Sequence, residues 1–152
     1  MVRLQVQNIK GVTNAINKYG KDAEDEIKSV TKITAQEVEE TAKSIAQSKK
    51  IWDKGTLVQS IQTLGKVADK GFTWVVAALQ PYSAYHEFGT GGRVNIPEGW
   101  NTMAAQFKGK GIKTVNIQAR PFMYPAYIKG RTIFKKNIKD ALKHLNKKFN
   151  NG

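Results

Sequence analysis

Glycine-rich stretches, two histidines and a few isolated carboxylates are the residues of this chain whose types could do chemistry. The stretch FGTGGR at residues 88–93 suggests a phosphate-binding loop, but such a loop needs a lysine and a hydroxyl residue directly after its last glycine. Arg93 and Val94 follow Gly92 instead, and in GKGIKT at residues 109–114 an isoleucine separates the last glycine from the lysine. Neither stretch therefore predicts a nucleotide site.

Metal and catalytic sites lack the clusters of residues that they need. The chain has no cysteine, and His86 and His144 lie far apart with no second histidine beside either, whereas metal sites need several such ligands. Hydrolysis needs a nucleophile with a base, or paired carboxylates. Residues 51–152 hold only five isolated acidic residues: Asp53, Asp69, Glu87, Glu98 and Asp140. We therefore expect no bound metal, no cofactor and no enzymatic activity.

Two aromatic segments remain, YSAYHEFGT at residues 82–90 and ARPFMYPA at residues 119–126. The aromatic residues of the first fall at three-residue steps, so one helical turn would place them on one face, and its glycine would supply the left-handed backbone that ends the turn. We expect the segments to meet as a structural corner in which Glu87 pairs with Arg120, whose guanidinium can bind a carboxylate through two hydrogen bonds. A ligand site is the weaker alternative. The residues assigned to the corner are Tyr82, Tyr85, Glu87, Phe88, Gly89, Thr90, Arg120, Pro121, Phe122 and Pro125.

Two amphipathic helices must position these segments. From Val12 to Gln47, apolar residues recur mostly at three- and four-residue steps, and a second such stripe predicts a helix from Pro125 to Phe149. The first helix would be about 50 Å long, which exceeds the width of a small domain. We expect it either to bend near Gly20 or to pack at one end on something outside the domain.

The rest of the chain predicts a small sheet. Alternation favours a short strand over Val2–Val6, and β-rich runs at 57–67 and 72–79 flank a turn sequence, ADKG, that is typical of a hairpin. Residues 112–118 predict a further strand. The expected fold class is α+β: a small, mostly antiparallel sheet with the long N-terminal helix and the C-terminal helix packed on it. The apolar face of the hairpin is assigned to Ile61, Leu64, Trp74 and Val76.

A long loop insertion is expected at residues 89–111, within a single domain covering residues 1–152. Its composition is rich in Gly, Asn, Lys and Pro, and one short helix is expected near residues 100–107. Loops of this length are usually functional or disordered. Trp100, Met103 and Phe107 recur at helical steps, so we expect them to anchor a partner.

The charge of the chain is +13 and is unevenly distributed. Residues 1–50 hold nine basic and seven acidic residues (+2), whereas residues 51–152 hold sixteen and five (+11). Such an excess predicts attraction to nucleic acid or to an acidic protein surface, with an ordinary solvated basic face as the alternative. The basic face of the C-terminal helix, the candidate contact for DNA or an acidic partner, comprises Lys129, Arg131, Lys135, Lys136, Lys139, Lys143, Lys147 and Lys148.

The chain also resembles a known family. The pattern Tyr-x-x-Tyr-x-Glu-Phe-Gly-Thr from Tyr82, followed by Ala-Arg-Pro-Phe-Met-x-Pro-Ala from Ala119, is similar to the small tail-component (neck or tail-completion) proteins of long-tailed double-stranded DNA bacteriophages. Residues 54–61, KGTLVQSI, resemble the family's Thr-Gly-x-Leu-x-x-Ser-Ile, with Lys54 in place of the threonine. The insert between the two main motifs is rich in lysine and glycine and departs from the pattern.

The resemblance implies a virion assembly protein rather than an enzyme. It would act at the head-tail junction as a subunit of a homo-oligomeric ring, with other phage neck and tail proteins as partners, after synthesis in the host bacterial cytoplasm. The basic helix keeps a second hypothesis open, a nucleic-acid-binding protein that contacts genomic DNA in the channel. No membrane contact is expected, since the longest apolar run, residues 74–79, is far below the roughly 18 residues that span a bilayer.

Overall fold

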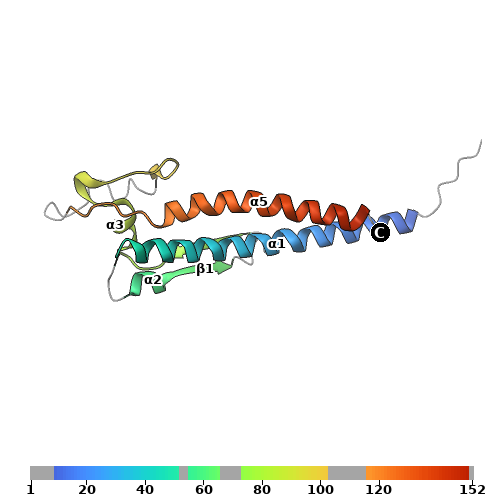
Figure 1. Cartoon of the computed structure of the whole chain (residues 1–152), viewed down its shortest axis with the longest axis horizontal. Coiled ribbons are helices and arrows are strands. Elements are labelled where there is room, and N and C mark those ends of the chain that lie inside the picture. The colour runs from blue at the N-terminus through green and yellow to red at the C-terminus, as the bar shows by residue number, and fades with distance from the viewer. Residues whose placement is uncertain (1–8, 52–54, 66–72, 103–115, 151–152) are drawn as a thin grey trace, which may run out of the picture.

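Two long helices dominate the fold (Figure 1). A computed structural model describes residues 9–51, 55–65, 73–102 and 116–150. Helix α1 spans Ile9–Ser48 and helix α5 spans Met123–Asn150, and the two lie side by side in opposite directions. Both helices were predicted from the apolar spacing, and α1 continues through Gly20 as a single helix.

Small residues set the spacing between α1 and α5. Ala42, Ala46 and Ala126 are fully buried where the helices meet. A Cβ added to Gly130 would overlap the Cγ2 atom of Val38, so a larger residue there requires the Val38 side chain or the helices to shift. Helices with small residues at their contact can approach more closely than the usual 8–10 Å between axes.

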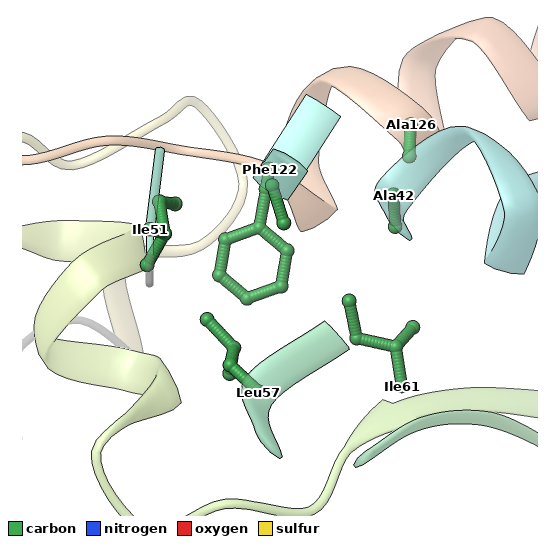
Figure 2. Packing of buried hydrophobic residues seen from close by; sticks show 7 residues of the cluster. Ala42, Ile51, Leu57, Ile61, Phe122 and Ala126 are labelled. Atoms are coloured by element: carbon green, nitrogen blue, oxygen red, sulfur yellow. The ribbon is translucent and has the colours of Figure 1, made fainter. Parts of the chain in front are cut away.

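The apolar core lies at one end of this helix pair. Figure 2 shows the Phe122 ring beside Ile51, Leu57 and Ile61, which reach it from the end of α1, from the short helix α2 (Thr56–Ser60) and from strand β1 (Ile61–Gly65). All four side chains are buried. Burying a large aromatic or aliphatic side chain contributes about 1.5–3 kcal/mol, so this cluster is the main apolar anchor of the fold.

The sheet is a two-stranded antiparallel hairpin within the described part of the chain. β1 pairs with β2 (Trp74–Ala78) in a register that sets Ile61 opposite Ala78 and Thr63 opposite Val76. The inward face of β1 carries Ile61 and Thr63, and Thr63 donates its backbone N–H to the Glu39 carboxylate of α1 (2.7 Å). The α+β class is thus confirmed.

Two details of the predicted hairpin are wrong. Leu57–Ser60 is helical rather than extended, because Gly55 (φ 78°) turns the chain into α2 before the strand starts at Ile61. Leu64 is 41% exposed, because alternation from Ile61 sends it to the opposite face from α1. The predicted strand at Val2–Val6 and the hairpin turn at residues 66–72 lie outside the described residues.

The described part of the connection between the hairpin and α5, residues 79–102 and 116–122, is mostly irregular. It contains the short helix α3 (Ser83–Phe88) and a 3₁₀ turn, η2 (Gly91–Arg93). Asn101 and Thr102 are helical, and the rest of the predicted short helix lies outside the described residues. Residues 116–118 of the predicted further strand have no strand structure, and the rest of that prediction lies outside the described residues.

Candidate functional site

The two aromatic segments do meet, at the start of α5. The carboxylate of Glu87, at the end of α3, accepts three backbone hydrogen bonds, from the N–H groups of Phe122 (2.8 Å), Met123 (2.9 Å) and Tyr124 (2.9 Å). The first N–H groups of a helix have no acceptor within the helix, and a negative charge there is favoured by the helix dipole. Glu87 therefore caps α5 from a distance of 35 residues along the chain.

The predicted ion pair between Glu87 and Arg120 is wrong, because Glu87 binds backbone N–H groups and not the Arg120 guanidinium. Both carboxylate oxygens already accept backbone hydrogen bonds, and the ion pairs of the described residues do not include Arg120. The Arg120 side chain is exposed, and its backbone N–H donates to the His86 carbonyl (2.7 Å). Burial lowers the pKa of His86 below its ordinary value, and the positive charge of Arg120 lowers it further.

Gly89 permits the tight path from α3 into the following segment. Its φ is 78° as expected, but its ψ of −174° lies outside the left-handed helical region that the sequence predicted. A Cβ there would lie 2.5 Å from the Arg93 carbonyl oxygen, 2.8 Å from that of Ile117 and 2.9 Å from the Ala119 nitrogen. All three are backbone atoms, so a larger residue cannot be accommodated by a side-chain rotation.

Thr90 fastens the two ends of the insertion to each other. Its backbone N–H donates to the Ile117 carbonyl (2.9 Å), and its hydroxyl oxygen accepts from the Ile117 N–H (2.8 Å). Thr90 is buried, so these bonds form away from water, where an unpaired polar group would be costly. The insertion thus starts and ends at one point of the fold.

The three aromatic residues of the first segment do not share a face. Phe88 is buried, Tyr82 is half-buried with its hydroxyl 2.7 Å from that of Thr56, and Tyr85 is 42% exposed. A three-residue step on an α-helix falls about 60° short of a full turn, so two such steps move Phe88 about 120° away from Tyr82. The predicted common face was wrong for this reason.

The prolines and Trp100 complete the corner. Pro125 lies in the first turn of α5, where its missing N–H breaks no helical bond, and the carbonyl of Pro121 accepts from the Lys49 ammonium (2.7 Å). The Trp100 ring packs edge-on against Phe88 (5.9 Å between ring centroids) and Tyr124 (5.6 Å). Trp100 therefore packs within its own chain, while Met103 and Phe107 lie outside the described residues.

The basic face of α5 is exposed to solvent. Among its eight cations, Lys148 alone has an ion pair within the described part of the chain, with Asp22 of α1 (2.8 Å). The bond to Lys148 holds the pKa of Asp22 below its ordinary value. The other seven are exposed and have no acidic partner among the described residues. This face therefore carries a concentrated positive charge.

The described residues give no sign of a catalytic or metal centre. No three of their His, Asp and Glu side chains lie close enough together to hold a metal ion. No helix in the described ranges is both long enough and apolar enough to cross a membrane.

Comparison with known families identifies the class of protein. Residues 10–89 match a family described as "Bacteriophage HK97-gp10, putative tail-component". The match covers more than half of the chain, and the chain belongs to this family of structural phage tail components. Comparisons with curated proteins and with solved structures gave no match. Membership of the family makes the protein a component of the virion.

Sequence reasoning missed the role of Glu87 as a helix cap. A signal for it was present, because α5 has no acidic residue in its first turn and no Ser, Thr, Asp or Asn just before it. These residues are the usual N-caps. A helix start without its own cap, together with the single acidic residue of the other segment, indicates a cap supplied from elsewhere in the chain.

Proposed function

We propose that this tail component acts at the head-tail junction, as a neck or tail-completion protein, and that it works as one subunit of a ring held by protein-protein contacts. The proposal goes beyond family membership in two respects, the place in the virion and the ring. It rests mainly on a surface that the chain's own described residues leave uncovered.

That surface is the outer face of the hairpin. Leu64 and Val75 form a cross-strand pair on the side away from α1, and each is 41% exposed. Leu79, just after β2, is 53% exposed. A two-stranded hairpin is marginally stable by itself and needs packing on a partner; α1 covers one of its faces only. An apolar pair on the other face suits a contact with a neighbouring protein.

The N-terminal part of α1 gives a second line of support. Tyr19 contacts the last turns of α5, through an edge-on ring contact with Phe149 and a hydrogen bond to Asn146 (2.9 Å). The helix begins at Ile9 and so extends beyond these contacts, by roughly 15 Å at 1.5 Å per residue. Helices this short are marginal in water without packing, which favours a neighbouring subunit or tail protein as support.

The test is a phage that carries Leu64→Lys and Val75→Lys together. We expect folded protein but few infectious particles, and electron micrographs showing separate full heads and tails if the protein acts at the junction. The control is Gln62→Lys, which adds one positive charge, as each of the two test substitutions does, at an already polar position of the same face. Tails of abnormal length would move the protein to length control, and normal virions would overturn the proposal.

A second candidate function, nucleic-acid binding, is favoured by the basic face of α5. Seven cations with no acidic partner among the described residues suit a polyanion, and DNA affinity that depends on several phosphate contacts falls steeply with salt. Measuring DNA binding at two salt concentrations tests this function. No detectable binding at low salt would leave an acidic protein as the partner of this face.

A further inference from the structure

A groove runs along one flank of the helix pair, between α1, α5 and β2. Its volume is about 440 Å³, and its lining is mostly apolar, with Trp74 and Val76 from β2 and Tyr127 and Phe134 from α5. One cation, the exposed Arg131, belongs to its lining. The ammonium of Lys32, which is not a lining residue, lies 5.7 Å from the centre of the Trp74 ring. The groove is thus apolar inside and positively charged at its edge.

A second flank of the pair presents the reverse pattern. Ile33 of α1 is 47% exposed, and Glu26, Glu37 and Glu40 lie seven residues before it and four and seven residues after it. Residues at these spacings share one side of a helix. None of the three glutamates has an ion pair among the described residues, but Glu37 is half-buried and its Oε2 atom is shielded from solvent, so Glu26 and Glu40 supply most of the exposed charge. We call this line of residues the acidic ridge: one exposed apolar side chain between carboxylates.

The groove and the acidic ridge lie on different flanks and share no residue. On α1 the groove takes Thr31, Thr34, Ala35 and Val38, which are turned about 80° or more around the helix from Glu26 and Ile33. Ile33 instead lies beside a shallow hollow lined by Asn137 and His144 of α5. One copy can therefore offer its ridge and its groove to two different neighbours at once.

We propose that the groove receives the acidic ridge of a second copy of this chain, with Ile33 inserted between Trp74 and Tyr127 and the ridge carboxylates beside Arg131. An apolar centre meets an apolar centre and negative charge meets positive charge, which is the complementarity that fixes partner and orientation at interfaces. Because the two surfaces differ, the contact is head-to-tail, and repetition gives a closed ring when the rotation allows it. The inference rests on the proposed ring and names the surfaces that would build it.

The chemistry of the contact also predicts its strength. A single half-exposed isoleucine and a few surface charges supply little binding energy, and the charges are screened by salt. Two free copies should therefore associate weakly. Association becomes strong once several contacts close a ring or a preformed tail end aligns the subunits, because the later contacts are then intramolecular.

Cysteine cross-linking tests the contact directly, since the chain has no cysteine of its own. In the full-length chain, Ile33→Cys with Tyr127→Cys places one thiol on the ridge and one at the groove. Disulfides form only when the two Cα atoms approach to about 4.4–6.8 Å. Under mild oxidation at high protein concentration, we expect a ladder of covalent dimers, trimers and larger species on a non-reducing gel.

The matched control is Ile33→Cys with Ile128→Cys. Ile128 follows Tyr127 on α5 and has a similar exposure (40% against 46%), but it does not line the groove. We expect the groove pair to cross-link at least tenfold faster than the control pair. Equal rates, or no ladder with the groove pair at any concentration, would overturn the inference.

A charge reversal tests the electrostatic part of the contact. Adding Arg131→Glu to the groove pair should slow the ladder about fivefold or more, and salt should slow the unmodified groove pair as well. Lys135→Glu makes the same change of charge one turn further along α5, at an exposed position outside the groove. Its effect should stay below about twofold, and an equal effect of both reversals would argue against a specific contact at Arg131.

Electron microscopy of the unmodified protein at the same high concentration separates the two proposals. Rings without cross-linking of the groove pair would keep the proposed function and reject this inference, with the hairpin face as the next surface to examine. The absence of any oligomer, both alone and on purified tails, would reject both. Cross-links formed only to a tail protein would show that a different partner occupies the groove and would also reject the inference.

Discussion

The two ends of the helix pair are held together by different kinds of contact. At the end near the α3–α5 corner, Phe122 is fully buried, and the buried Glu87 accepts three backbone hydrogen bonds. At the other end Leu145 is also buried, but the polar contacts are exposed: the hydrogen bond of Tyr19 to Asn146 and the ion pair of Lys148 with Asp22, beside an edge-on ring contact. Buried contacts resist exchange with water, whereas exposed ion pairs contribute little. The corner therefore carries more of the stability, and the exposed polar contacts of the far end are suited to exchange for those of a partner.

Among changes that test this difference between the two ends, the largest loss of stability is expected at Phe122. Phe122→Ala should lower the free energy of unfolding by about 3–5 kcal/mol, since it opens a cavity in the main apolar cluster. Tyr19→Ala at the far end should cost a small fraction of that. Urea denaturation of both variants checks the difference, and similar losses would mean that the two ends are equally important.

Glu87 is the next most sensitive position. Glu87→Gln should cost about 2–4 kcal/mol, because the amide loses the charge and turns a donor toward helix N–H groups that need an acceptor. Arg120→Glu should cost far less, since Arg120 has no ion pair among the described residues.

The double variant distinguishes a helix cap from an ion pair. If Glu87 acts as the cap, reversing both charges together (Glu87→Arg with Arg120→Glu) restores nothing. Recovery of stability in that double variant would instead support an ion pair between Glu87 and Arg120.

A smaller effect is expected where the helices approach most closely. Gly130→Ala should lower the free energy of unfolding by up to about 2 kcal/mol, because overpacking against Val38 costs about 1–3 kcal/mol while alanine favours a helix by about 1 kcal/mol. Val38→Ala in the same chain should remove most of that penalty. A double variant no more stable than the sum of the two changes would show that the close approach is not the cause.

The smallest loss of stability is expected at Glu39, whose carboxylate links α1 to the hairpin. Hydrogen bonds from Lys43 and then from Thr63 hold the pKa of Glu39 below the ordinary 4.5. The Glu39 carboxyl therefore binds a proton more readily in the unfolded chain than in the folded one. The stability that ionised Glu39 contributes is complete above pH 4.5 and is lost as the pH falls through the lowered pKa of the folded state. Glu39→Gln should cost about 1 kcal/mol at pH 7 and flatten the dependence of stability on pH below 4.5; an unchanged acid limb would exclude Glu39 as its source.

Much of the fold follows from local sequence. The apolar spacing predicts both helices to within a few residues, and hairpin-forming runs predict β1 and β2, since periodicity is a local property of a chain. The error at Leu64 has a simple geometric cause. Ile61 and Leu64 are three residues apart, so a regular strand cannot place both on one face. The inward position goes to Thr63, whose polar bonds to α1 the apolar pattern could not reveal.

The sequence predicts that the two aromatic segments meet, but it does not predict which groups Glu87 binds there. The sequence places Glu87 and the ARPF segment together, yet it favours a charged partner for the carboxylate over three backbone N–H groups. Backbone donors are the same in every residue, so no residue type marks them. The sequence indicates such a backbone partner only indirectly, here through a helix that begins without a capping residue of its own.

The hydrogen bonds between Thr90 and Ile117 also separate the length of the segment between them from the rest of the fold. Because its two ends are fastened to each other, a change in its length outside the part that packs through Trp100 alters mainly the entropy of closing a loop, about 0.6 kcal/mol for each doubling. The chain should therefore tolerate a longer or shorter segment there while the helix pair keeps its geometry. For the experimenter, it is the natural place to insert an affinity tag or a fluorescent label without unfolding the protein.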